Sequence, residues 1–293
     1  MKKTRVVKAK APGSAIEKWF ARKFTVTAEN YDSRSKIFRK IMAGSMKATG
    51  NPVYGGLVTK LNQGKVIESV SVPLNVSLSE HTKQVALPAD LLKKAVREAT
   101  YRAGMHSCIC RESIGGCKNY PDAPSCIFIG EGARQLVSNG LANELTGHEA
   151  CARIDLAAKM GLLGHAYFIE AEQYFWGVPN ENLDKFLEIC FCCTCCCLNV
   201  ANLKYASHAQ KKTNVSLGWT IVVDDNCTLC HTCVEICPIG AISEVSCKMT
   251  VSDVCYGCSN CVPRCPQSAR KLVHTGPPIS DLKDAFHQVN LKL

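Results

Sequence analysis

The chain contains the run Cys227-Thr228-Leu229-Cys230-His231-Thr232-Cys233-Val234-Glu235-Ile236-Cys237-Pro238. The same pattern returns 28 residues later as Cys255-Tyr256-Gly257-Cys258-Ser259-Asn260-Cys261-Val262-Pro263-Arg264-Cys265-Pro266. Both copies have the spacing C-x2-C-x2-C-x3-C-P, and two such matches at one offset indicate an internal repeat. Clustered thiols in a reducing compartment bind metal rather than form a disulfide framework. The repeat therefore predicts a small C-terminal domain built around two metal centres.

The short gaps between these cysteines suit iron–sulfur clusters. Gaps of two residues let the backbone curl, so that three thiolates reach three irons while backbone amides face the sulfurs. The proline after each fourth cysteine stiffens the exit from the loop. Structural zinc is the alternative for any C-x2-C pair, but the repeated x3-Cys-Pro ending is not typical of zinc ribbons.

Residues 220–274 resemble bacterial two-[4Fe–4S] ferredoxins of the clostridial type, on the strength of these two runs, and they cover about a fifth of the chain. The resemblance implies a pseudo-symmetric α+β fold that passes single electrons between partner enzymes. It also implies crossed ligation, in which the fourth cysteine of each run binds the other run's cluster. The first cluster would be held by Cys227, Cys230, Cys233 and Cys265, and the second by Cys255, Cys258, Cys261 and Cys237.

Cys247 lies between the two runs and matches no ligand position, so we expect it to be a buried thiol without metal. Because each half of the domain lends a ligand to the other half, the domain should lose its fold when iron is removed.

A second group of cysteines precedes the repeat. Apart from the isolated Cys151, its members are Cys108, Cys110, Cys117, Cys126, Cys190, Cys192, Cys193, Cys195, Cys196 and Cys197. The elements C-x-C-R and I-C-x-C-C-x-C-C-C resemble a region that precedes ferredoxin modules in some iron–sulfur proteins of anaerobes. So many thiols predict a third metal or redox centre.

An iron–sulfur cluster is the expected third centre, and a zinc or mixed thiolate site and a redox-active thiol pair are the alternatives. Adjacent side chains diverge along a strand or a helix, so adjacent thiols cannot all bind one cubane. On a helix, Cys192 would share a face with Cys196, and Cys193 with Cys197. Some of these would then join the earlier cysteines around the cluster.

Two further side chains are candidates for a role near metal. Arg111, beside Cys110, would lower a thiolate pKa or donate to cluster sulfur, unless it is an ordinary surface arginine. His165 would be a ligand or a proton carrier, although a histidine at the start of an apolar strand is more often structural. The stretch 127–132 lacks the third glycine of a dinucleotide fingerprint, so we expect no nucleotide cofactor.

The expected fold class is α+β, with five segments. They are a basic N-terminal extension of amphipathic helices and short strands (1–80), a mixed α/β cysteine-rich domain (81–200), a linker (201–219), the ferredoxin domain (220–274) and a C-terminal tail (275–293). In the second segment, Pro88 is expected to begin a helix that Gly104 ends. The capping box Thr146-Gly147-His148-Glu149 is expected to begin another, which stops at Gly161.

The net charge of +10 resides entirely in residues 1–50, which hold thirteen Lys and Arg against three acidic residues. Apolar residues recur there at helical spacing, around Trp19 and again around Ile37. Such helices suit an acidic partner protein or the anionic inner face of a membrane, unless they simply pack on the rest of the chain. No nucleic-acid motif accompanies the charge, so nucleic acid is not expected as a partner.

No secretory signal or apolar run of about 20 residues is visible, so a cytoplasmic location is expected, with membrane contact limited to the periphery. The expected function is that of an electron-carrying subunit, which exchanges electrons with a redox partner protein within a multisubunit oxidoreductase. The main alternative is a reductase whose N-terminal cysteine centre is catalytic and receives electrons from the ferredoxin domain. A third, non-redox hypothesis makes the extra cysteines a metal store or a zinc site.

Overall fold

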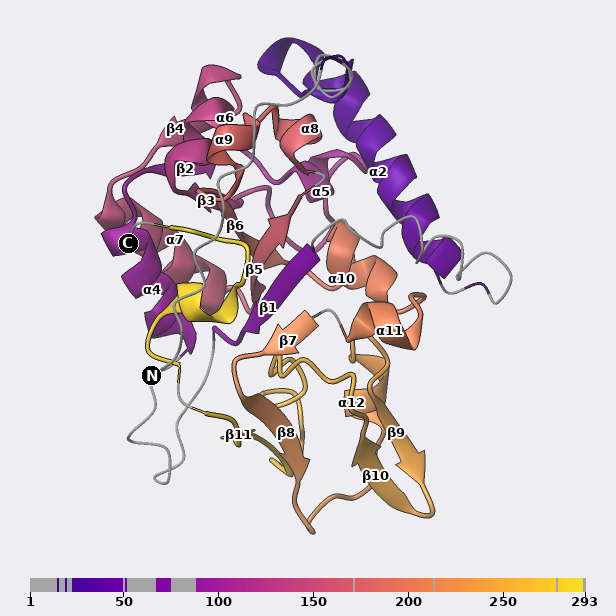
Figure 1. Ribbon diagram of the computed structural model, residues 1–293. Helices are drawn as coiled ribbons and strands as arrows, with labels where there is room; N and C mark the ends of the chain where they lie inside the picture. Colours follow the sequence, from indigo (N-terminus) through magenta and orange to yellow (C-terminus); the bar gives the residue numbers. More distant parts are fainter. Residues whose placement is uncertain are drawn as a thin grey trace.

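The computed structural model describes residues 23–49, 51, 67–74, 88–170, 172–212, 214–277 and 279–291, together with Ala15 and Trp19. A larger unit built on one sheet lies above a smaller C-terminal unit in Figure 1. This mixture of helices and sheets agrees with the expected class. Most of the first basic helix, and the glycine turns between residues 52 and 66, lie outside the described residues.

The larger unit contains a seven-stranded sheet in the order β4-β2-β3-β6-β5-β1-β7. Its strands are β1 (Ile67–Val72), β2 (Arg102–Met105), β3 (Ile127–Ile129), β4 (Ala142–Glu144), β5 (Leu163–Ile169), β6 (Leu187–Cys192) and β7 (Asn214–Ser216). Neighbours pair antiparallel except β1 with β7, which are parallel. The strand β6 is the central one, and its side chains are buried on both faces.

Helices cover both faces of this sheet, and each face has its own apolar core. The helices of the larger unit are α2 (Tyr31–Thr49), α4 (Pro88–Glu98), α5 (Ile109–Glu112), α6 (Arg134–Ser138), α7 (Gly147–Lys159), α8 (Glu172–Trp176), α9 (Asn180–Leu183), α10 (Leu198–Leu203) and α11 (His208–Lys211), with short 3-10 turns at Ala28–Asn30, Glu131–Ala133 and Leu282–Ala285. Helix α12 (Thr232–Glu235) belongs to the smaller unit. One core joins α4 and α7 to Ile189 and Phe191 of β6. The other joins α6 and α8 to Cys190 and Cys192 of the same strand.

Two expected helix boundaries can be compared with the structure: the start of α7 and the end of α4. The Thr146 hydroxyl accepts from the backbone N–H of Glu149, and the Glu149 carboxylate accepts from Thr146 N–H, which confirms the capping box of α7. The expectation that Gly104 ends the helix that begins at Pro88 was wrong. Helix α4 already ends at Glu98, because the guanidinium of Arg102 donates to three carbonyls at its C-terminus.

Gly104 lies instead in β2, where a side chain would displace the ends of two neighbouring side chains. A Cβ atom on this glycine would lie 2.6 Å from Leu145 Cδ1 and 2.7 Å from the guanidinium carbon of Arg153. The glycine therefore serves close packing between β2 and its neighbours.

The expected linker at 201–219 is folded in part. Helices α10 and α11 lie within or overlap it, and β7 extends the sheet by pairing with β1. Its residues therefore connect the sheet directly to the smaller unit rather than separating the two.

The smaller unit contains two pairs of antiparallel strands, and it is hereafter called the ferredoxin module after the sequence resemblance of residues 220–274. Strand β8 (Trp219–Val223) pairs with β11 (Arg270–His274), and β9 (Ile242–Val245) pairs with β10 (Lys248–Val251). The hairpin between β9 and β10 turns at Ser246 and Cys247, both with positive φ, as type I′ turns require. Cys247 is therefore exposed at a turn, and the expectation that it is buried was wrong.

The basic helix α2 packs on the cysteine-rich unit through one face. The ring of Phe38 stacks on Phe175 of α8, with 3.8 Å between centroids. The opposite face leaves Ile37 and Ile41 more than half exposed, beside the exposed Lys36 and Lys40. Among the described helices, none is long and apolar enough to cross a membrane.

Replacing Thr146 by Ala should destabilise the chain by about 1 kcal/mol, because the N-terminal amides of α7 lose their side-chain acceptor. Chemical denaturation followed by circular dichroism would measure the change. Ser138→Ala, at an exposed position in α6, is the control and should have a much smaller effect. Equal losses for the two variants would contradict the capping role.

Candidate metal centres

The first four predicted ligands surround one cavity in the ferredoxin module. Cys227, Cys230 and Cys233 line it together with Cys265 from the second run. We call these four the first thiol set. The second run thus reaches across to the first one, which brings together residues that the sequence separates by more than thirty positions.

Three buried donors point at sulfur atoms of the module. The guanidinium of Arg270, at the start of β11, donates to Cys233 Sγ at 2.9 Å. The backbone N–H of Ala269 donates to Cys265 Sγ, and that of Ala241 donates to Cys237 Sγ, both at 3.2 Å. Donors of this kind are the outer contacts that the sulfur ligands of iron–sulfur clusters receive.

The remaining ferredoxin cysteines form the second thiol set, which consists of Cys237, Cys255, Cys258 and Cys261. Cys237, Cys255 and Cys258 pack on the same apolar cluster as Tyr256. Burial, and then the nearby Cys255 and Cys237, raise the pKa of Cys258 to about 12 in the metal-free chain. Burial and the same neighbours also raise the pKa of Cys261. A bound cation would offset this cost of holding several thiolates together.

The N-terminal cysteines separate into two groups because of strand β6. Side chains alternate along a strand, so Glu188, Cys190 and Cys192 face one core, while Ile189 and Phe191 face the other. Cys193 follows on the second face, and a turn then begins at Thr194. The helical alternative was therefore wrong: Cys192 pairs with Cys197 and not with Cys196.

The first of these groups, the thiol chamber, contains Cys108, Cys110, Cys126, Cys190, Cys192 and Cys197. Two sulfur pairs lie 3.1 Å apart, Cys126 with Cys190 and Cys192 with Cys197. Cys190 also donates to the buried carboxylate of Glu188 at 2.7 Å. Six thiols and a carboxylate thus meet in the interior on one face of the sheet.

The protonation of the chamber is set by contacts between thiols. Hydrogen bonds from Cys190 and Cys197 lower the pKa of Cys192 to about 7, against the effect of burial. A hydrogen bond from Cys190 also favours the Cys126 thiolate, but burial and Glu188 outweigh it and raise that pKa to about 12. The chamber therefore contains hydrogen-bonded thiols whose pKa values differ widely.

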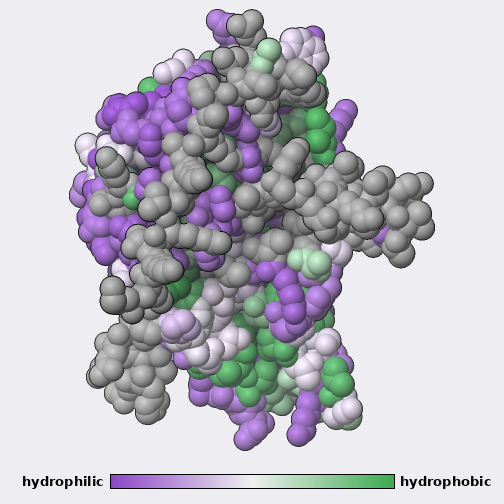
Figure 2. Space-filling model, in the orientation of Figure 1, coloured by the Kyte–Doolittle hydropathy of each residue, from purple (hydrophilic) through white to green (hydrophobic). Residues whose placement is uncertain are grey.

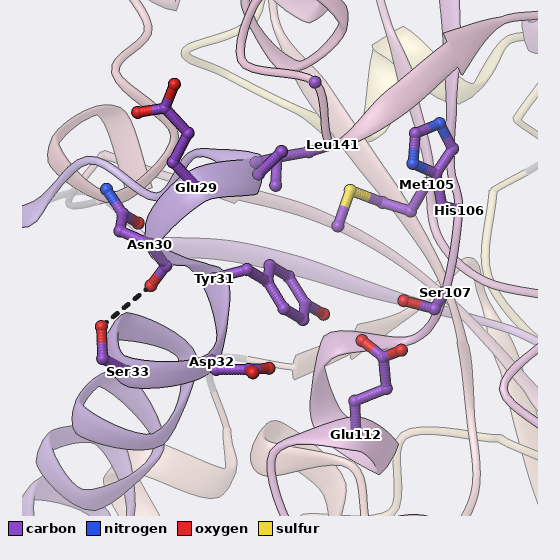
Figure 3. A pocket seen from close by; sticks show the side chains of 12 residues that line it. Glu29, Asn30, Tyr31, Asp32, Ser33, Met105, His106, Ser107, Glu112 and Leu141 are labelled. Atoms are coloured by element: carbon purple, nitrogen blue, oxygen red, sulfur yellow. Dashed lines mark hydrogen bonds between the residues drawn. The ribbon is translucent and has the colours of Figure 1, made fainter.

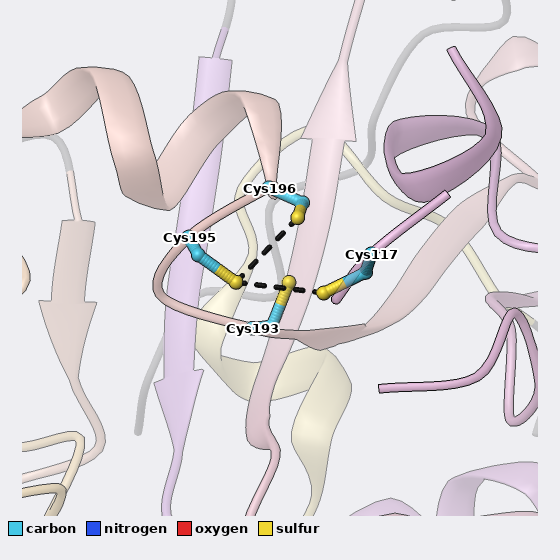
Figure 4. Close-up of side chains that lie close together, drawn as sticks. All are labelled: Cys117, Cys193, Cys195 and Cys196. Carbon is cyan, nitrogen blue, oxygen red and sulfur yellow. Dashed lines mark hydrogen bonds between the residues drawn. The ribbon is translucent and has the colours of Figure 1, made fainter. Parts of the chain in front are cut away.

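The second group, the four-thiol site, contains Cys117, Cys193, Cys195 and Cys196 (Figure 4). Its sulfur atoms all lie within 4.8 Å of one another. Cys195 is exposed, whereas Cys193 and Cys196 are buried. Cys117 therefore lies apart from Cys108, Cys110 and Cys126, its neighbours in the expected ligand pool.

Two arginines lie between these groups. Arg111 is fully buried, so it is no ordinary surface arginine, and it donates to the carbonyl oxygen of Phe191 in β6 at 3.0 Å. Burial lowers its pKa, but nearby Cys108 and Cys193 outweigh this effect and raise it. Arg39 of α2 donates to the carbonyl oxygens of Cys110 at 2.8 Å and Cys196 at 3.1 Å. No sequence motif marks Arg39, because only the fold brings α2 to these loops.

An aromatic bridge of His165, Tyr167 and Tyr256 connects the chamber to the ferredoxin module. The His165 ring lies 5.5 Å from that of Tyr167 and 5.3 Å from that of Tyr256. Among the described residues, neither ring nitrogen of His165 and neither tyrosine hydroxyl has a hydrogen-bond partner. Burial lowers the pKa of His165 to about 4, so the imidazole is neutral. Its place opposite Cys190 in the β5–β6 register puts it beside the chamber.

A hollow on the surface lies beside the chamber, because it is lined by Ser107, the residue before Cys108. It runs between the start of α2 and the end of β2, and the Tyr31 ring points across it toward Ser107 and Glu112 (Figure 3). Burial, and then Glu112, raise the pKa of Tyr31. None of its twelve described lining residues is a cysteine, so it is not part of the metal centres.

Comparison with known proteins identifies one part of the chain. The profile of the 4Fe-4S binding domain matches residues 220–243, which contain the whole first cysteine run. No curated protein and no solved structure matches the chain. The chain thus contains a 4Fe-4S binding domain and clusters of cysteines beyond it, a combination that indicates iron–sulfur electron transfer.

Replacing Arg270 by Gln should make the reduction potential of the centre at the first thiol set more negative, on the order of tens of millivolts, because a cation beside Cys233 favours the reduced form. A redox titration followed by EPR would measure the shift. Lys271→Gln removes an equal charge at an exposed neighbouring position and is the control. Equal shifts in both variants would show that the contact with Cys233 has no special effect.

Proposed function

We propose that the chain carries single electrons between partner oxidoreductases through three iron–sulfur centres. Two are [4Fe–4S] clusters in the ferredoxin module, and the third occupies the thiol chamber. When bound, such clusters supply reversible one-electron chemistry. The observation that carries the proposal is the contact between the second thiol set and the chamber.

Within the module, the donor set fits two clusters with crossed ligation. Cys265 lines the cavity of the first run, and Cys237 packs with Cys255 and Cys258 of the second. The amides of Ala269 and Ala241 donate to the two crossing thiols, Cys265 and Cys237, at the same distance. This equivalence is what a pseudo-symmetric pair of sites requires.

The thiol groups form a series from the surface to the interior. In the first thiol set Cys230 is exposed, which suits exchange with an external partner. In the second set Cys258 packs against the core that contains Cys192 and Cys197 of the chamber. Tyr256 contacts His165 across the same boundary. An electron that enters at the exposed end would therefore meet each thiol group in turn.

The chamber's chemistry fits a polynuclear centre. Its six thiols provide more ligands than one metal ion can bind. Within the described residues, Cys126, Glu188 and Cys190 form the one group of three in the chamber whose ligand atoms all lie within 4.8 Å of one another. Thiolates that each bind a different iron lie further apart than the 3.1 Å of the two close sulfur pairs, so a cluster would take one ligand from each pair and the others from Cys108 and Cys110. The unpartnered nitrogens of His165 would then have a polar neighbour in the filled chamber.

Two surfaces would meet partner proteins. Figure 2 shows apolar residues gathered on one face of the ferredoxin module. Val222 and Val245 are exposed large apolar side chains of this module. Helix α2 presents exposed Ile37 and Ile41 among lysines, which suits an acidic partner or an anionic membrane surface. Contact of the chain with a multisubunit oxidoreductase, at either surface, is part of the proposal.

Anaerobic iron and sulfide analysis should find more than eight irons per chain, because two cubanes account for eight. Cys192→Ser and Cys126→Ser should lose only the excess iron and keep the EPR signals of the module. Cys151→Ser is the control, since this thiol lies on α7 beside Arg97 and outside all four groups. A count of eight in the unmodified chain would remove the third centre, and a count well below eight would remove the module's second cluster.

A cavity beside the chamber favours a second candidate function, a reductase. It is lined by Phe38, Ile109, Cys110, Ile169, Trp176, Glu188, Cys190, Cys197, Leu198 and Asn199. Its walls are mostly apolar, and they include three thiols and the Glu188 carboxylate. A small molecule bound there would be adjacent to the chamber, and Glu188 would pass on the proton that it accepts from Cys190.

A measurement of the turnover of small-molecule acceptors distinguishes the electron carrier from the reductase. A pure electron carrier, once reduced, should not consume small-molecule acceptors at a catalytic rate. A reductase should, and Glu188→Gln should lower its rate at least tenfold while the iron content stays unchanged. Glu181→Gln, a carboxylate removed elsewhere on the surface at α9, is the matched control.

A further inference from the structure

The four-thiol site is built by two loops that meet on the face of the sheet opposite the chamber. Cys193 and Cys196 belong to the core of α4 and α7, against which Cys117 also packs. Cys192 and Cys197, their neighbours in sequence, belong to the other core. The backbone of β6 therefore separates the two groups, and one centre cannot use both.

The sulfur spacing in this site fits a single metal ion. Cys195 Sγ lies 3.6 Å from Cys117 Sγ and 3.5 Å from Cys196 Sγ, and all four sulfurs lie within 4.8 Å of one another. Four thiolates around one zinc, with bonds of about 2.3 Å, form a tetrahedron whose edges are about 3.8 Å. A cubane separates its thiolates much further, because each binds a different iron at a corner.

We propose that Cys117, Cys193, Cys195 and Cys196 bind one zinc ion as a closed, tetrahedral, structural site. The ion would join the loop after α5 to the turn after β6, two segments more than seventy residues apart in sequence. Four thiolates leave no open position for substrate, which is the arrangement of structural zinc sites. The site is thus distinct from the electron-carrying centres.

The surroundings suit a site with excess negative charge. Four thiolates around a divalent ion carry two net negative charges. The Arg111 guanidinium neighbours Cys193, and Arg39 donates to the carbonyl oxygen of Cys196. Asn119 approaches Cys195 Sγ at 4.0 Å from the loop that holds Cys117. These groups are the outer contacts that metal sites use to orient their ligands.

Metal analysis of the full chain, purified without oxygen, tests the proposal. We expect about one zinc per chain, and X-ray absorption at the zinc edge should show four sulfur neighbours at about 2.3 Å. This measurement uses the unmodified protein, so it does not depend on the folding of a variant. Nitrogen or oxygen neighbours, or absence of zinc, would overturn the proposal.

Variants then assign the zinc to these residues. Cys195→Ser and Cys117→Ser should lose most of the zinc and keep the iron, while Cys247→Ser, at the exposed hairpin turn, should keep both. Because iron and zinc are counted in the same sample, failure of the zinc site is distinguishable from failure of the iron–sulfur centres. Loss of about four irons from Cys195→Ser would show a cubane instead. A ferric tetrathiolate signal that disappears in this variant would show a single iron, which also contradicts the proposal.

Discussion

The alternation of side chains along β6 is the constraint on which the arrangement of the metal centres depends. A strand sends successive side chains to opposite faces, and this one is central in the sheet, with a core on each side. Its cysteines therefore cannot form one compact group. Those on one face meet Cys108, Cys110 and Cys126, and Cys193, together with the turn that follows, meets Cys117. A dense run of thiols becomes two separate sites without any insertion between them.

The contact between the chamber and the ferredoxin module suits electron transfer between the two. His165, Tyr167 and Tyr256 are fully buried where the two units meet, and their polar atoms lack partners among the described residues. Buried polar groups of this kind are costly unless something satisfies them. Their position between two groups of thiols is explained if both groups hold charged clusters. The exposed Cys230 lies at the other end of the same series.

The repeat of Cys227–Pro238 predicted a metal-binding domain, because its cysteine spacing is local and specific. The family comparison agrees over residues 220–243. The capping box at Thr146 was equally local and was confirmed. The division of the N-terminal cysteines into the thiol chamber and the four-thiol site was not predictable in the same way. It depends on whether residues 190–197 form a strand or a helix. Glu188 could have been found from its alternation with Cys190 and Cys192. Arg39 could not, because its contacts with Cys110 and Cys196 come only from the packing of α2.

The most direct test of the account is the EPR spectrum of the chemically reduced chain, recorded with and without the third centre. If a paramagnetic centre in the chamber lies beside the second thiol set, its spin should couple to that of the neighbouring cluster. The unmodified chain should then give a broadened, interacting spectrum, and Cys192→Ser should restore the simpler spectrum of a two-cluster module. Identical spectra from both proteins would contradict the placement of an electron-carrying centre in the chamber.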